Sequence, residues 1–243
     1  MARAADILVE TLLKHGVDRV FCVPGESYLA VIDAMFDAPE IDVVTTRHEG
    51  GASFMAVADA KMTGKPGIIM CSRGPGATNA AIGVHVAQQD AVPMVMFVGQ
   101  VAREDLGRSA FQEVNYSQTF GDMAKWVVEI TDADKVAENV RRAFTIAQSG
   151  IPGPVIVSLP EDMLLDETDA PALGPTAVTQ PQPSAGDIAE ICDMLTRAKR
   201  PVIIAGGQVG GEEGRNALRA VSEAWNVPVA TSWRHQDIFD TSH

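Results

Sequence analysis

The spacing of apolar residues along the chain alternates between a helical and a strand-like period. Apolar side chains at helical intervals predict helices near residues 7–12, 27–36, 48–62, 74–85, 134–148, 188–196 and 213–225, with Gly16 in a capping position after the first. Short apolar runs predict strands at residues 20–23, 41–45, 68–71, 92–98, 126–130, 155–159, 202–205 and 227–230. This repeated β-α-β order predicts an α/β fold with a doubly wound, mostly parallel sheet, followed by the start of a second α/β domain.

The composition changes between the two predicted domains. Residues 166–184 are rich in Pro, Thr and Ala, and Leu173 is their only large apolar residue apart from Val178. We therefore expect one domain over residues 1–165, a linker over residues 166–184, and a second domain that begins at residue 185. The remaining segment to residue 243, about sixty residues, is short for an independent α/β domain, so we expect a truncated one.

Four polar or glycine-rich segments each follow a predicted strand. They are residues 24–26, 47–49, 72–79 and 99–112. In a doubly wound sheet, the residues that contact ligands gather in loops at the carboxyl ends of the strands. We therefore expect these four segments to meet at one edge of the sheet and to form the functional site there.

Charge and cysteine content narrow the range of partners. The chain has 19 basic and 32 acidic residues, so its formal net charge is 19 − 32 = −13. This balance argues against nucleic acid and against an anionic membrane surface as partners, because both carry negative charge. The three cysteines are widely spaced and form no metal-ligand pattern, which favours a reducing cytoplasm. The longest apolar stretch, residues 91–98, is too short to span a bilayer.

Glu49 follows a predicted strand and precedes Gly50 and Gly51. An acidic residue in the first helical turn interacts favourably with the helix dipole, so a purely structural role is one explanation. The two glycines are costly in a helix and indicate that a flat group approaches the backbone closely. On the residues alone, both explanations remain open.

Other candidate features are weaker when taken singly. The turn over residues 72–79 can bind a phosphate or simply set a helix against the sheet, and it lacks the Lys-Ser/Thr pair of a P-loop. The turn over residues 206–211 can face a nucleotide or serve as a permissive turn. Cys22 and Cys71 lie in predicted strands, where we expect buried small apolar residues and not nucleophiles.

Six segments together resemble the N-terminal half of the thiamine diphosphate enzymes of the acetohydroxyacid synthase and 2-oxoacid decarboxylase family. In order they are VFCVPGE (residues 20–26), RHEGGA (47–52), GPGATN (74–79), VGQ (98–100), AFQE (110–113) and SGIPGPV (149–155). The resemblance implies that residues 1–165 form a pyrimidine-binding domain and that residues 185–243 begin the central domain. It also implies an enzyme that acts as a lyase, transferase, carboligase or decarboxylase on a 2-oxoacid.

The resemblance also implies roles for individual residues. Glu49 would hydrogen-bond N1′ of the cofactor aminopyrimidine and so activate thiamine diphosphate, which stores the carbanion left by loss of CO₂. The residues expected to act in catalysis are Glu49, Gln112 and Glu26. The residues expected to bind the cofactor are Pro24, Gly25, Glu49, Ser72, Pro75, Thr78 and Asn79.

Three departures from the family pattern qualify this assignment. Ile151 stands where synthases that bind FAD carry Arg, which speaks against FAD. No His-His pair lies near Phe111-Gln112, which speaks against pyruvate decarboxylase activity. The GDG…NN motif that holds Mg²⁺ and the diphosphate is absent, so we expect magnesium on a C-terminal domain and no metal site in this chain. The resemblance further implies a homodimer or homotetramer, and we expect the fragment alone to be inactive.

Three rival functions remain. The same scaffold supports an oxidase or an acyl-CoA lyase, and a degenerate relative can serve as a non-catalytic assembly module. A nucleotide-binding Rossmann protein is disfavoured, because no acidic residue is suitably placed after Gly76.

Overall fold

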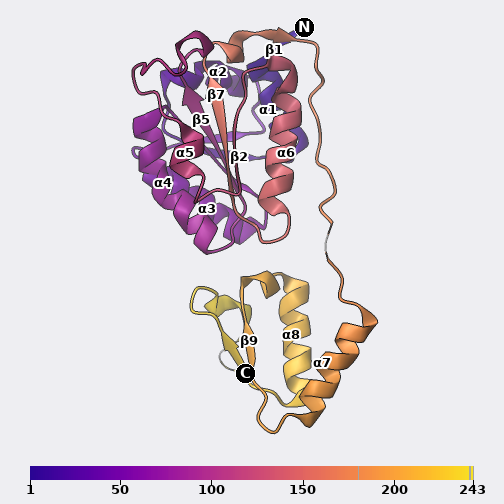
Figure 1. The fold of residues 1–243 in the computed structure, drawn as a ribbon. Helices are drawn as coiled ribbons and strands as arrows, with labels where there is room; N and C mark the ends of the chain where they lie inside the picture. The colour runs from indigo at the N-terminus through magenta and orange to yellow at the C-terminus, as the bar shows by residue number, and fades with distance from the viewer. Residues whose placement is uncertain (180, 241, 243) are drawn as a thin grey trace. The chain divides into compact units, whose positions relative to one another are not determined.

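The computed structural model describes residues 1–179, 181–240 and 242. Two compact units divide the chain, Met1–Val178 and Thr179–His243, and each is described by itself (Figure 1). Among the described residues, no helix is both long and apolar enough to cross a membrane.

Unit 1 is built on a six-stranded sheet with the order β3-β2-β4-β5-β7-β6, in which every pairing is parallel. The strands are β2 (Arg19–Cys22), β3 (Asp42–Thr45), β4 (Gly67–Cys71), β5 (Met94–Gln100), β6 (Trp126–Glu129) and β7 (Pro154–Pro160). Every residue of β4, β5 and β7 is buried, as the continuous apolar runs predict for strands covered on both faces. The predicted doubly wound α/β fold is confirmed.

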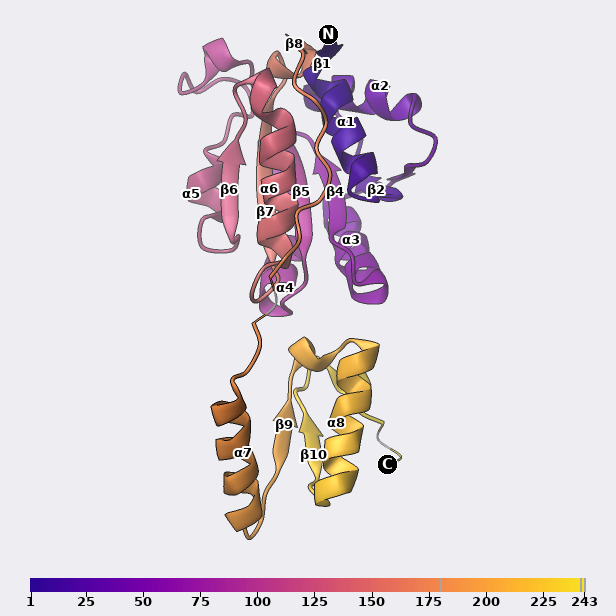
Figure 2. The ribbon, with the colours of Figure 1, turned by 90° about the vertical axis from the view of Figure 1, so that its right-hand side faces the viewer.

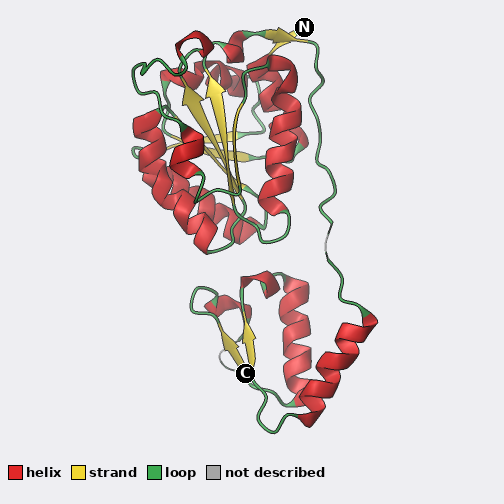
Figure 3. Ribbon diagram, in the orientation of Figure 1, coloured by secondary structure: helices red, strands yellow, loops and turns green. Residues whose placement is uncertain are grey.

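Helices cover both faces of this sheet (Figures 2 and 3). One face carries α1 (Ala4–Lys14), α2 (Leu29–Phe36) and α6 (Val136–Gln148), whose buried residues share one apolar core. The other face carries α3 (Glu49–Thr63), α4 (Gly74–Gln89) and α5 (Tyr116–Phe120), which share a second core. The alanine-rich α3 and α4 pack closely because their contact surfaces are made of small side chains.

Some elements of unit 1 differ from the sequence pattern. The helix expected from residue 27 begins with a 3-10 turn, Glu26–Tyr28, and α4 continues to Gln89 instead of ending at residue 85. Helix α5 forms where the sequence indicates only a loop. Tyr116 and Phe120 are four residues apart and both buried against the sheet, and this tertiary contact stabilises a helix too short for its local sequence to predict.

The start of the segment expected to be a linker contacts unit 1. Strand β8 (Glu167–Thr168) pairs antiparallel with β1 (Ala2–Arg3), and Lys14 Nζ donates to the carbonyl of Ala172 at 2.9 Å. Ala172 also packs with Ile7 and Ala137 in a small apolar cluster. Amino-acid composition alone cannot reveal this pairing of backbone segments. The boundary between the two units, after Val178, therefore falls inside the segment that was expected to be a linker.

Unit 2 contains the second set of predicted elements. They are α7 (Ala185–Arg197), β9 (Ile203–Ala205), α8 (Glu212–Trp225) and β10 (Val229–Thr231), and the two strands pair in parallel. Its buried core comprises Ala205, Leu218 and Ile238. Ile204 on β9 and Ile191 on α7 remain exposed, so this unit buries far less apolar surface than unit 1.

Candidate active site

The strand order places a topological switch point between β2 and β4. From β2 the chain moves outward to β3 and then returns across β2 to β4, so the loops after β2 and β4 leave the sheet in opposite directions. These two loops nevertheless touch each other. A Cβ on Gly25 would lie 2.7 Å from Ser72 Cβ, so only a glycine fits here. The predicted site residues Gly25 and Ser72 are therefore neighbours.

Glu49 points into this switch point and not into solvent. It is the first residue of α3 and only 8% exposed, and Asn79 Nδ2 on α4 donates to its Oε2 at 3.0 Å. Its Oε1 lies 3.2 Å from the position that a Cβ on Gly76 would occupy, and Ser72 Oγ lies 2.9 Å from the same position. The structure thus brings together the predicted residues Glu49, Asn79, Ser72 and Gly25.

His48 caps the N-terminus of α3, a role that the sequence analysis did not assign. Its Nδ1 accepts the Gly50 amide hydrogen at 3.0 Å. A Cβ on Gly50 would lie 2.9 Å from this Nδ1, whereas nothing lies within 4 Å of the corresponding position on Gly51. The expectation that both glycines admit a flat ligand is wrong for Gly50, because the chain's own imidazole fills that space.

The buried thiols and the buried phenol near Glu49 are poor acids. Burial raises the pKa of the Cys71 thiol far above its usual range, and the charge of Glu49 adds to the rise. Burial likewise raises the pKa of the Tyr28 hydroxyl, which donates to the carbonyl of Val23. Cys22 and Cys71 are buried free thiols, as predicted. Both thiols and the phenol stay protonated at neutral pH, so none of them competes with Glu49 for proton chemistry.

Several predicted site residues lie at the same edge without a contact to Glu49 among the interactions described. Pro24, Glu26 and Pro75 are exposed. Thr78 is also exposed, and its hydroxyl donates to the carbonyls of Gly74 and Pro75 at 2.9 and 3.0 Å, within its own helix. Their assigned roles therefore stay predictions.

Gln112 lies in a strained loop that contacts the start of α4. Its φ is +65°, and Ser109 in the same loop has a φ of +57°, a conformation that non-glycine residues rarely adopt. The Gly74 amide donates to the carbonyl of Gln112 at 3.1 Å, and a Cβ on Gly74 would lie 2.7 Å from Val114. Such strain persists where the surroundings enforce it, often at functional sites, and here it fixes the Gln112 backbone beside the switch point.

The sequence analysis missed an ion pair beside this turn. Arg73, which precedes α4, has a side chain that is only 11% exposed, and its Nη2 donates to Glu161 at the end of β7. The pair ties the turn after β4 to the end of β7, two strands away in the sheet. The sequence could not predict this ion pair, because Glu161 is far from Arg73 along the chain.

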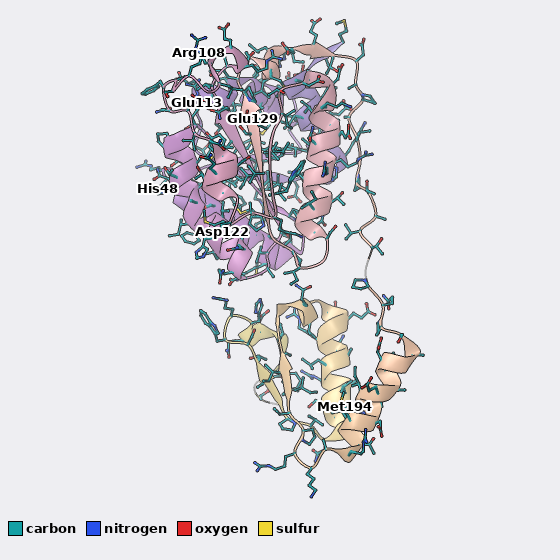
Figure 4. All side chains as sticks on the ribbon, viewed as in Figure 1. His48, Arg108, Glu113, Asp122, Glu129 and Met194 are labelled. Carbon is teal, nitrogen blue, oxygen red and sulfur yellow. The ribbon has the colours of Figure 1, made fainter. Side chains whose placement is uncertain are left out.

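The far side of the Gln112 loop borders a cavity of about 370 Å³, lined among others by Gln100, Glu113, Glu129 and Ser158. Figure 4 shows Glu113 and Glu129 at the end of unit 1 toward which β5 and β7 point. Gln100 Nε2 donates to Glu129 and to the carbonyl of Val114, so the amide of the VGQ segment is engaged in the fold. Glu113 accepts the amide hydrogens of Gly107 and Ala110, which closes the loop on itself.

We expect acid to release this loop before it unfolds the unit. The Gly107 amide, followed by that of Ala110, lowers the pKa of the Glu113 carboxyl below its ordinary value of 4.5. A lowered folded-state pKa means that the stabilisation is present above the unfolded-state value and is lost as pH falls through the folded-state value. Hydrogen exchange at Gly107 and Ala110 should therefore accelerate as the pH falls below 4.5, the ordinary pKa of this carboxyl, once corrected for intrinsic rates. In the Glu113→Gln variant, exchange at these two amides should be fast already at about pH 6. Slow exchange in that variant would contradict the role of Glu113 in closing the loop.

Two family models match this chain. The model described as "Thiamine pyrophosphate enzyme, N-terminal TPP binding domain" matches residues 2–119, which include α3, α4 and every predicted site residue. The model described as "Thiamine pyrophosphate enzyme, central domain" matches residues 188–243 in unit 2.

Curated relatives are similar over nearly the whole chain. The mitochondrial acetolactate synthase catalytic subunit of Aspergillus candidus is 35% identical, over 97% of this chain and 36% of its own length. The acetolactate synthase isozyme 3 large subunit of Escherichia coli K12 is 34% identical, over 100% of this chain and 43% of its own length. The chloroplastic acetolactate synthase 3 of Brassica napus is 36% identical, over 95% of this chain and 36% of its own length. The chain thus spans less than half the length of these relatives, and it belongs to the thiamine pyrophosphate enzyme family.

Proposed function

We propose that this chain supplies the pyrimidine-binding part of a thiamine diphosphate-dependent, acetolactate synthase-like lyase or carboligase that acts on a 2-oxoacid. The single observation that carries the proposal is the buried Glu49 carboxylate at the switch point between β2 and β4. A buried carboxylate normally has all its acceptors engaged. At Glu49 only Oε2 accepts a described hydrogen bond, which leaves Oε1 for a donor on a ligand.

Two glycines and Ser72 surround the Glu49 carboxylate. Gly25 and Gly76 let the loop after β2 and the start of α4 lie directly against Ser72, and Gly76 adds no side chain beside Oε1. A protonated ring nitrogen would donate to Glu49 in a charge-assisted hydrogen bond. We assign Glu49 to holding and moving that proton, and Pro24, Gly25, Ser72, Pro75 and Thr78 to shaping the pocket. Glu26 and Gln112 are assigned to the substrate side.

The cofactor, when bound, supplies the electron sink for decarboxylation of the 2-oxoacid. Within the part of the chain that the structure describes, no group of three or more His, Cys, Asp or Glu side chains is placed to hold a metal. We therefore propose that Mg²⁺ and the diphosphate are held by residues outside this chain. The length of the relatives supports this, since more than half of each lies beyond the matched region.

FAD is not part of the proposal. Ile151 is 71% exposed in the connection before β7, at the edge of the sheet opposite Glu49. In unit 2, the structure around the turn over residues 206–211 favours a permissive turn over a nucleotide-binding site. A Cβ on Gly207 would lie 2.3 Å from His235 Nε2, so the imidazole packs on the turn and its glycine makes room for the chain's own side chain. Ser232 Oγ lies 3.1 Å from His235 Nδ1, which fixes the ring there.

Assembly and location complete the proposal. We propose at least a homodimer, in keeping with the family resemblance, and a cytoplasmic protein, in keeping with three free cysteines of which Cys192 is exposed. Two of the relatives above are named mitochondrial and chloroplastic, so cell fractionation is the direct test of location.

The proposal is tested by incubating the complete gene product with thiamine diphosphate, Mg²⁺ and a panel of 2-oxoacids. We expect loss of a 2-oxoacid and release of CO₂ that depend on the cofactor, and no turnover by the 243-residue chain alone. Oxygen consumption would identify an oxidase, and turnover only of CoA esters would identify an acyl-CoA lyase. A gene product that binds no thiamine diphosphate in calorimetry would be an assembly module and would end the proposal.

A further inference from the structure

Helices α3 and α4 cross at an unusually close contact between Ser53 and Gly83. A Cβ on Gly83 would lie 2.3 Å from Ser53 Oγ and 2.8 Å from the Ser53 carbonyl carbon, so the crossing admits no side chain there. Ser53 is fully buried, and its hydroxyl donates to the carbonyl of Gly50 at 3.0 Å. The two helices are therefore locked against each other in one register.

This register determines what lies one turn earlier. Both helices begin at the carboxyl edge of the sheet and run in the same direction. Glu49 precedes Ser53 by four residues, and Asn79 precedes Gly83 by four residues, so each lies one helical turn above the crossing on the same side. Because both residues lie one turn from the crossing on parallel helices, the Asn79 amide lies against the Glu49 carboxylate. Asn79 Nδ2 donates to Glu49 Oε2 at 3.0 Å.

We propose that Asn79 is a positioning residue that orients the Glu49 carboxylate, and not a ligand of the cofactor as its place in the GPGATN segment suggests. The inference rests on the proposed function, because it assigns Oε1 to the cofactor. A carboxylate can rotate to present either oxygen, and an amide donor on Oε2 removes that freedom. Oε1 is then the oxygen that lies beside Gly76, near Ser72.

Asparagine suits this role better than aspartate. Its amide donates to a carboxylate, whereas the isosteric carboxylate of an Asn79→Asp variant would place a second negative charge against Oε2. A residue that merely fills space should tolerate Asn79→Asp better than Asn79→Ala. A residue that donates to Glu49 should show the opposite order.

The test measures the affinity of the complete gene product for thiamine diphosphate by calorimetry in the presence of Mg²⁺. We expect Asn79→Ala to weaken binding about tenfold and Asn79→Asp to weaken it on the order of a hundredfold. Asn139→Ala, which removes an asparagine on α6 that donates to the carbonyl of Lys135, is the matched control and should leave binding unchanged. Thermal unfolding midpoints confirm that each variant folds.

A second background separates positioning from direct contact with the cofactor. If Asn79 acts through Glu49, then Asn79→Ala should cost little further affinity in a Glu49→Ala protein, which has no carboxylate for the amide to orient, whereas a direct ligand would give additive losses. Additive losses, or Asn79→Asp binding as well as wild type, would overturn the inference while leaving Glu49 in place. If Glu49→Gln leaves both binding and turnover unchanged, it is the proposed function that fails.

Discussion

Glu49→Gln in the complete gene product is expected to lower 2-oxoacid turnover by a factor on the order of 10²–10⁴, the usual contribution of a positioned acid or base. Glutamine preserves the size and the capacity to accept from Asn79, but it cannot hold and return a proton at a ring nitrogen. The loss should appear in kcat, because the interaction matters when the proton moves and not only when the cofactor binds.

The control for this experiment is Glu40→Gln, which removes the charge of an exposed glutamate before β3 and should leave kcat unchanged. Near-ultraviolet circular dichroism and the unfolding midpoint of Glu49→Gln should match those of the parent, since the side chain retains its volume. Turnover within a factor of a few of the parent would remove Glu49 from the mechanism.

Gly83→Ala is expected to destabilise unit 1 by about 2–3 kcal/mol, at the upper end of the cost of overpacking. The added methyl group would meet Ser53 Oγ at 2.3 Å and the Ser53 backbone at 2.8 Å, so α3 and α4 must separate. Separation also breaks the register that brings Asn79 to Glu49. Denaturant unfolding of the 243-residue chain measures the first effect, and weaker binding of thiamine diphosphate by the complete gene product measures the second.

Two variants show whether the close crossing is responsible. Gly51→Ala adds a methyl group on the same pair of helices where no atom lies within 4 Å, so it should be neutral or stabilising by up to about 1 kcal/mol. Ser53→Gly should be destabilising alone, yet it should recover part of the stability of Gly83→Ala because it removes side-chain atoms that clash. If Gly83→Ala is as stable as Gly51→Ala, the helices are not locked at this point.

Many strands and helices of unit 1 could be predicted because the sequence features that specify them lie within each element. The apolar runs of β4, β5 and β7 and the glycine at the end of α1, where Gly16 adopts a φ of +70°, are properties of neighbouring residues. Helix α5 and the β1–β8 pair escaped prediction because their stability comes from contacts between distant segments. Tyr116 and Phe120 bury against the sheet, and residues 167–168 pair with the N-terminus.

The candidate site shows the same division. The sequence by itself determined that strands would end in polar or glycine-rich loops, that these loops would share one edge, and that Glu49 would start a helix, since chain order and residue type specify all three. The tertiary structure decided which oxygen of Glu49 is engaged, that Gly50 makes room for His48, and that Arg73 pairs with Glu161. Those contacts depend on the angle and register at which α3, α4 and β7 pack, and the shapes of side chains far apart in sequence set that geometry.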